Sequence, residues 1–227
     1  MSLIFPASLQ PTLPIAGDER RFPVHRLYCV GKNYAAHARE MGADPEREAP
    51  CFFLKTPDAI VLDGRVPYPS GTSNLHYEGE LVIAIGKGGS DIAPEQALEH
   101  VFGYALGLDM TRRDLQLESS RRGQPWDTGK SFEHCAPLSA VVPLKQSGHF
   151  ASGSLRLWLN GELRQDADFR DLIWANHDII SALSRLYTLC PGDLIFTGTP
   201  AGVGPVVRGD RIRLVIERLG ELHAEIV

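Results

Sequence analysis

The fold is decided by two stretches, YEGELVIAIG at residues 77–86 and FGYALGLD at residues 102–109. Both are short apolar runs of the length expected for buried β-strands. Residues two apart in a strand point to the same face, so Glu78 and Glu80 are predicted to project together from the start of one strand. Asp109 closes the second run, at the end of a neighbouring strand. The sequence therefore predicts three carboxylates gathered at one place in a sheet.

Such a cluster has two interpretations. Carboxylates held close together repel each other and lose solvation unless a cation compensates them. An all-oxygen ligand set is what Mg2+ or Mn2+ prefers. Alternatively, Glu78 and Glu80 belong to a solvated strand face, and Asp109 is a helix N-cap that precedes Thr111. The spacing alone leaves both interpretations open.

The rest of the chain favours an α+β fold. Alternating apolar residues flank Asn160-Gly161 in 154–165, which predicts a hairpin with a type I′ turn. Short helices are predicted at 33–42, 94–101 and 111–123, and a longer helical stretch at 169–189. Strands do not alternate regularly with long helices, which disfavours Rossmann and barrel layouts. Residues 1–24 are proline-bearing and predict an extended lead-in to a single domain at 25–227.

Composition excludes several classes of function. The formal net charge is −5 and no basic run exceeds two residues, which argues against nucleic acid and anionic membrane as partners. No apolar run approaches the length of a membrane span, and the N-terminus lacks the features of a signal peptide. The four cysteines have no CxxC spacing, so reduced thiols and a cytoplasmic location are expected.

Two further groups could take part in proton transfer and charge stabilisation. His37 and Glu40 are three apart on a predicted helix, so a carboxylate could orient an imidazole that deprotonates water. Lys130 lies in a loop between glycine and serine, where an ammonium could stabilise an oxyanion. In each case the commoner alternative is an ordinary solvated side chain.

Three other residues are candidates for binding a substrate. Arg113 and Gln116 are three apart just after Asp109, and the arginine could grip a carboxylate. Thr199 lies in the glycine-rich turn 197–204, whose backbone N–H groups could cradle an oxygen anion. This turn is not a phosphate-binding loop, because no Gly-Lys-Ser/Thr follows it. The alternatives are a solvated arginine in a charge-rich helix and a plain turn.

Taken together, these segments resemble the fumarylacetoacetate hydrolase family, in particular its short acylpyruvate hydrolases. The resemblance covers about residues 26 to 216. It rests on five segments in the family's order and spacing: GKNYAAHAREMG (31–42), LHYEGELVIAIGKGG (75–89), GYALGLDMTRRDLQ (103–116), PWDTGKSF (125–132) and IFTGTPAGVGPV (195–206).

The resemblance implies a mixed β-sheet roll with short peripheral helices, assembled as a homodimer, with 25–227 as one catalytic domain. It also implies a role for each candidate. The metal ligands for Mg2+ or Mn2+ would be Glu78, Glu80 and Asp109; the catalytic residues would be Lys130 and the water-activating pair His37 and Glu40, on a lid helix; the substrate contacts would be Arg113, Gln116 and Thr199.

The implied reaction is hydrolysis of a carbon–carbon bond in an acylpyruvate such as fumarylpyruvate, giving pyruvate and a carboxylic acid. The partner is then a small 2-oxo acid. The same site chemistry could instead decarboxylate oxaloacetate, or tautomerise or isomerise a 2-oxo acid. A protein of another class, an inactive metal-stabilised binding protein, also stays open. Two adjacent arginines after Asp109 and a cysteine at 135 depart slightly from the family pattern and leave the substrate preference undecided.

Overall fold

A six-stranded mixed sheet forms the centre of the molecule, which we describe from a computed structural model for residues 3–35 and 49–227. Its strand order is β12-β9-β8-β15-β3-β4, and β15 pairs with β3 in parallel while the other neighbours are antiparallel. All seven residues of β8 are buried, as expected for a continuous apolar strand covered on both faces. The strands are β3 (Leu27–Gly31), β4 (Cys51–Lys55), β8 (Gly79–Ile85), β9 (Val101–Leu108), β12 (Val142–Pro143) and β15 (Leu194–Phe196).

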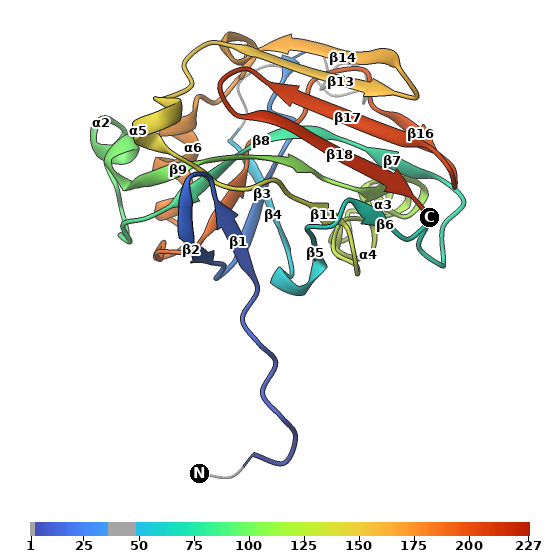
Figure 1. Cartoon of the computed structure of the whole chain (residues 1–227), viewed down its shortest axis with the longest axis horizontal. Coiled ribbons are helices and arrows are strands. Elements are labelled where there is room, and N and C mark those ends of the chain that lie inside the picture. Colours follow the sequence, from blue (N-terminus) through green and yellow to red (C-terminus); the bar gives the residue numbers. More distant parts are fainter. Residues whose placement is uncertain (1–2, 36–48) are drawn as a thin grey trace.

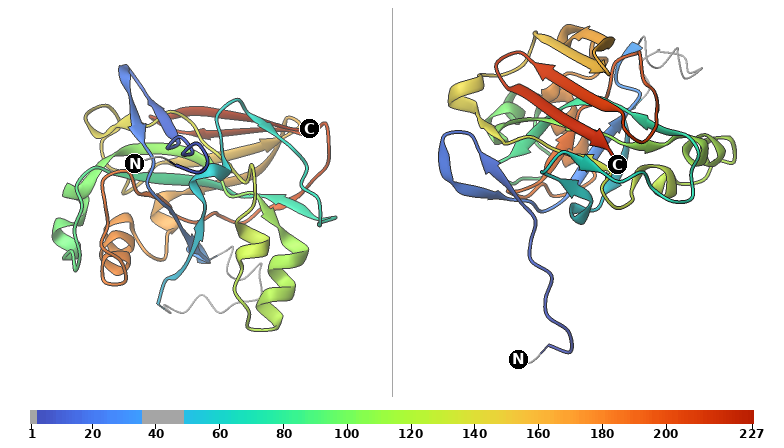
Figure 2. Two further views of the ribbon diagram at one scale, coloured as in Figure 1. Left: turned by 90° about the horizontal axis from the view of Figure 1, so that it is seen from below. Right: turned by 45° about the vertical axis from the view of Figure 1, so that its right-hand side comes forward.

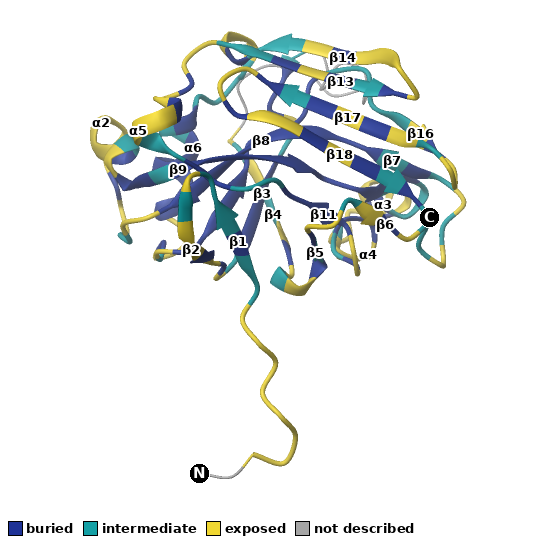
Figure 3. Cartoon of the chain, viewed as in Figure 1, coloured by how far each residue is buried: buried dark blue, intermediate teal, exposed yellow. Residues whose placement is uncertain are grey.

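A five-stranded sheet of order β14-β13-β17-β18-β6 packs over the central sheet (Figure 1). Strand β13 contacts β8, and β17 and β18 contact β9. Burial alternates along β17, so one of its faces meets the core and the other meets solvent (Figure 3). The strands are β6 (Arg65–Val66), β13 (Ser154–Leu159), β14 (Glu162–Asp168), β17 (Arg211–Ile216) and β18 (Gly220–Ile226).

Three small sheets and several short helices surround these layers. Figure 2 (left) shows α3 and α6 projecting on the same side of the strands. The small sheets are β1 (Thr12–Ile15) with β2 (Asp18–Pro23), β5 (Ile60–Val61) with β11 (Ala136–Pro137), and β7 (Leu75–Tyr77) between β10 (Thr111–Arg112) and β16 (Gly204–Val206). The helices with bounds in the described residues are α2 (Pro94–Ala97), α3 (Arg113–Arg121), α4 (Asp127–Lys130), α5 (Leu144–Ser147), α6 (Asn176–Ser184) and the 3-10 turns η1 (Pro57–Ala59), η2 (Leu98–His100) and η3 (Phe169–Asp171).

The mixed β-architecture with short helices confirms the fold class expected from the sequence. Asn160 and Gly161 have φ values of 53° and 86°, as a type I′ turn between β13 and β14 requires. The stretch 169–189 differs, because it contains only η3 and α6 rather than one long helix. Within the expected lead-in, residues 12–23 form the β1–β2 hairpin, and its Leu13 and Phe22 are buried in the main core. The predicted helix 33–42 lies mostly outside the described residues.

The central sheet brings the conspicuous acidic residues together. Gly79 in β8 pairs with Leu108 in β9, and the Asp109 N–H donates to the Glu78 carbonyl at 2.8 Å. This register places the end of β9 beside the start of β8. Strand β15 runs antiparallel to β8 and leads the 197–204 turn to the same end. Over residues 3–35 and 49–227, no helix is both long and apolar enough to cross a bilayer.

Candidate active site

Glu78, Glu80 and Asp109 form a buried cluster where β8 begins and β9 ends. These residues are 4 %, 1 % and 1 % exposed, and one oxygen from each lies within 4.8 Å of the others. A solvated strand face, the alternative interpretation of the sequence, is therefore excluded for these glutamates. Buried carboxylates at this separation need positive charge around them.

Lys130 supplies part of that charge from the end of α4. Its ammonium donates to Glu78 Oε2 at 2.7 Å, to Asp109 Oδ2 at 2.6 Å and to the Thr111 hydroxyl at 2.8 Å. Burial lowers the pKa of Lys130, the Asp109 and Glu78 carboxylates raise it, and the net shift is upward. Although the lysine is only 4 % exposed, its two acidic partners keep it charged. The alternative interpretation of the sequence, in which Lys130 is an ordinary solvated side chain, is therefore excluded.

Arg113, at the start of α3, is the second cation of the cluster. Its guanidinium forms an ion pair with Glu78 Oε1 and donates to Gln116 Oε1 at 3.1 Å. The two helices that carry these cations pack closely at Gly129, where a Cβ would lie 2.7 Å from the Gln116 backbone nitrogen. Glycine at this position therefore allows Lys130 to reach the site beside α3.

Lys55 is a third buried cation, and the sequence analysis missed it. Its fully buried side chain ends β4, with Nζ 2.7 Å from Asp109 Oδ1, and it also donates to the backbone carbonyls of Lys130 and Met110. Burial lowers the pKa of Lys55, the Asp109 carboxylate raises it, and the net shift is upward. The one available signal was a lysine at the end of the apolar run CFFLK, sharing a strand face with Phe53.

Glu80 provides the test of whether a cation fits this cluster. In the described part of the chain it makes no ion pair, and its Oε2 accepts one hydrogen bond, from the Gly198 N–H at 2.7 Å. Burial, and then the Asp109 and Glu78 carboxylates, raise the pKa of Glu80 well above its usual range. Asp109 Oδ1 has the Lys55 ammonium at 2.7 Å and accepts no well-aligned hydrogen bond from a described residue. The donor set therefore fits a hard divalent cation.

Thr199 lies beside the acidic cluster, held by a glutamine from the other sheet. Its hydroxyl donates to the Gly79 carbonyl at 2.9 Å and accepts from Gln165 Nε2 at 2.8 Å. The fully buried Gln165, on β14, also donates to the Pro200 carbonyl and accepts from the Gly79 N–H. No pattern in the sequence points to Gln165, because its hydrogen-bond partners are more than 30 residues away.

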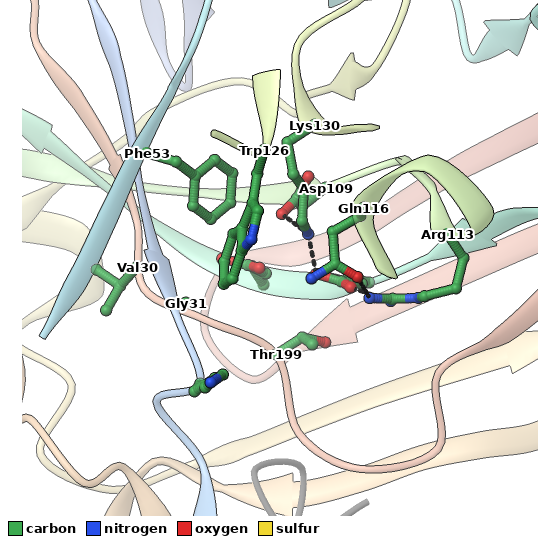
Figure 4. A pocket seen from close by; sticks show the side chains of 12 residues that line it. Val30, Gly31, Phe53, Asp109, Arg113, Gln116, Trp126, Lys130 and Thr199 are labelled. Carbon is green, nitrogen blue, oxygen red and sulfur yellow. Dashed lines mark hydrogen bonds and ion pairs between the residues drawn. The ribbon is translucent and has the colours of Figure 1, made fainter. Parts of the chain in front are cut away.

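The acidic cluster lines one cavity together with Arg113, Gln116, Lys130 and Thr199, and this cavity also has an aromatic wall. Phe53 and Trp126 lie against each other with ring centroids 5.8 Å apart. Figure 4 shows these rings near Val30 and Gly31, while Arg113 and Gln116 lie at the other side of the view. The cavity thus has paired carboxylates and cations on one part of its surface and the aromatic rings of Phe53 and Trp126 on another.

Seven of the nine residues singled out in the sequence line this cavity: Glu78, Glu80, Asp109, Arg113, Gln116, Lys130 and Thr199. They come from β8, the ends of β7 and β9, α3, α4 and the turn after β15. His37 and Glu40 lie outside the described residues. Their roles, and the individual roles of the other seven, stay predictions.

Comparison with known proteins places the chain among enzymes. The family model described as "Fumarylacetoacetate (FAA) hydrolase C-terminal" matches residues 26–227. A fumarylpyruvate hydrolase from a Ralstonia species is 48 % identical over 180 residues, which cover 79 % of this chain and 93 % of that protein. The human mitochondrial oxaloacetate tautomerase FAHD1 is 43 % identical over 196 residues, covering 85 % and 87 %.

A solved structure agrees with this placement. The fumarylpyruvate hydrolase of Pseudomonas aeruginosa, in complex with Mn2+ and pyruvate, superposes with a TM-score of 0.97 at 52 % identity. The match covers 100 % of this chain and 99 % of that one. The chain therefore belongs to the fumarylacetoacetate hydrolase family.

Proposed function

We propose that the protein is a divalent-metal-dependent hydrolase that cleaves an acylpyruvate, with fumarylpyruvate as the favoured substrate, into pyruvate and a carboxylic acid. One observation carries the proposal: three buried carboxylates, with Glu80 unpaired by any described cation, share a cavity with Lys130 and Arg113. The similarity to fumarylpyruvate hydrolases, one of them solved with Mn2+ and pyruvate, supports the choice of metal and substrate.

Glu78, Glu80 and Asp109 would hold Mg2+ or Mn2+, which when bound supplies Lewis acidity toward the adjacent oxygens of a 2-oxo acid. Arg113 and Gln116 present donors at one side of the cavity, where they would orient the substrate carboxylate. Thr199 would border the bound 2-oxo acid from the turn after β15, its hydroxyl held in place by Gln165.

Lys130 would stabilise negative charge that develops on the substrate oxygens. Its three N–H donors are all used, by Glu78, Asp109 and Thr111, so a bond to substrate would replace one of these. The ammonium is already desolvated and charged, which makes such an exchange less costly than recruiting a solvated lysine.

His37, oriented by Glu40, would remove a proton from water as the water oxygen attacks the distal carbonyl carbon. The bond between that carbon and the methylene carbon of the pyruvoyl group then breaks. Its electron pair leaves with the pyruvoyl part as an enolate, which takes up a proton to become pyruvate. The acyl part leaves as a carboxylic acid, so one water is consumed for each bond broken.

A second function, oxaloacetate tautomerisation, is favoured by the similarity to oxaloacetate tautomerase. Like hydrolysis, it passes through an enolate of a 2-oxo acid, but it consumes no water and breaks no carbon–carbon bond. Decarboxylation of oxaloacetate would use the same charge stabilisation and release CO2. The three activities therefore differ in their products rather than in the groups that bind the 2-oxo acid.

The test is a comparison of kcat/KM for fumarylpyruvate, acetylpyruvate and oxaloacetate with Mn2+ and with Mg2+. Pyruvate release with loss of diketone absorbance reports hydrolysis, CO2 release reports decarboxylation, and the enol absorbance of oxaloacetate reports tautomerisation. We expect an acylpyruvate to give the highest kcat/KM. A higher kcat/KM for oxaloacetate tautomerisation would assign the protein to the second function.

A further inference from the structure

We propose that Lys32 is a specificity-determining residue that binds a carboxylate at the distal end of the acyl group. The inference rests on the proposed acylpyruvate hydrolase function and narrows its substrate class to acylpyruvates with a second carboxylate. Lys32 lines the same cavity as the acidic cluster and follows Gly31, the last residue of β3.

The backbone at Lys32 is the first observation. Its φ of 58° lies in the left-handed region, which glycine and asparagine adopt more readily than lysine. Residues held in this region by the surrounding structure cluster at active sites and ligand-binding sites. Of the lining residues, Lys32 is the one non-glycine with such a backbone in the described chain.

The charges of the cavity are the second observation. Arg113 and Lys130 also line it, but both are paired with carboxylates of the acidic cluster. Lys32 makes no ion pair with any residue in 3–35 or 49–227, and its side chain is exposed. Among the described residues that line the cavity, Lys32 therefore carries the positive charge that remains available for a ligand.

The shape of the cavity is the third observation. In Figure 4 the strand end at Val30 and Gly31 lies on the opposite side of the view from Arg113. The Phe53 and Trp126 rings stand near this strand end, and a Cβ on Gly31 would lie 3.0 Å from Trp126. A flat unsaturated acyl chain can pass along these rings, with its pyruvoyl end toward Arg113 and its distal carboxylate toward Lys32.

The test compares fumarylpyruvate with crotonoylpyruvate, in which a methyl group replaces the distal carboxylate. Wild type, Lys32→Gln, Lys32→Arg and the matched control Lys87→Gln are assayed by pyruvate release. Lys87 is exposed and does not line the cavity. Glutamine keeps the same backbone strain as lysine, so thermal melts should show equal stability for all four proteins.

We expect Lys32→Gln to lower kcat/KM for fumarylpyruvate about tenfold, the scale of one charge-assisted contact at a partly exposed site. The loss should lie mostly in KM and should shrink with added salt, while crotonoylpyruvate changes less than about twofold. Lys32→Arg should recover most of the activity. Equal losses on both substrates, or none on fumarylpyruvate, would overturn the assignment. If wild type cleaves neither substrate, the proposed function fails and the assignment falls with it.

Discussion

Replacing Lys130 with Met should destabilise the metal-free protein far more than the metal-loaded one. The substitution keeps most of the side-chain volume but removes an ammonium that lies 2.7 Å from Glu78 Oε2 and 2.6 Å from Asp109 Oδ2. Both carboxylates are almost fully buried, so they then lack one of the cations that compensate them.

The expected cost follows from that burial. Removing one partner of a buried ion pair costs about 3–5 kcal/mol, because the remaining charge is left uncompensated. For a domain of this size, that corresponds to a fall in melting temperature of about 6–20 °C. A divalent cation bound to the same carboxylates replaces the missing charge, so Mn2+ should raise the melting temperature of the variant more than that of wild type.

The assay is a thermal melt of wild type, Lys130→Met and Lys145→Met, each with excess chelator and with excess Mn2+. Lys145 is exposed on α5 and serves as the matched control. Turnover of Lys130→Met with Mn2+ should fall about a hundredfold, the loss seen when one oxyanion-stabilising donor is removed. The reasoning is refuted if Lys130→Met has the same melting temperature as wild type in chelator and Mn2+ raises both melting temperatures equally.

Three further outcomes are expected. His37→Ala and Glu40→Ala should reduce acylpyruvate hydrolysis strongly and oxaloacetate decarboxylation less, since only hydrolysis needs an activated water; intact hydrolysis in both variants would make them a surface pair. Gln165→Leu removes three buried hydrogen bonds and should lower the free energy of unfolding in urea by about 2–4 kcal/mol; a loss below about 1 kcal/mol would contradict this. Hydrogen bonds from the Arg170 side chain and backbone lower the pKa of Asp168 to about 2. The stabilisation from this carboxylate is therefore present above pH ~4 and is lost as the pH falls toward 2. Across that pH range, the Asp168→Asn variant should lose less stability than wild type.

The parts of the site that the sequence predicts are those set by local periodicity. The two-residue spacing of Glu78 and Glu80 fixes a shared strand direction, and the apolar run before Asp109 indicates a second strand. The antiparallel register of β8 and β9 then joins the three acids. This pattern is visible because it depends on neighbours in sequence.

The features that the sequence does not predict depend on contacts between residues far apart in the chain. Lys55 reaches Asp109 from β4, 54 residues earlier, and Gln165 reaches the Gly79 backbone 86 residues away. The apolar run before Lys55 is the one local hint of its burial, and a glutamine in a hairpin has no such hint. The β1–β2 hairpin was not predicted because Pro14 and Pro23 usually indicate irregular chain, although prolines are tolerated in an edge hairpin.

The measurement that tests the account most directly is pyruvate release from fumarylpyruvate by metal-free protein, before and after one equivalent of Mn2+, for wild type and Asp109→Asn. The account predicts no release by either protein without metal. With Mn2+, wild type should release one pyruvate for each fumarylpyruvate consumed, and the variant almost none. Full pyruvate release by metal-free wild type, or by Asp109→Asn without a loss of Mn2+ affinity, would contradict it.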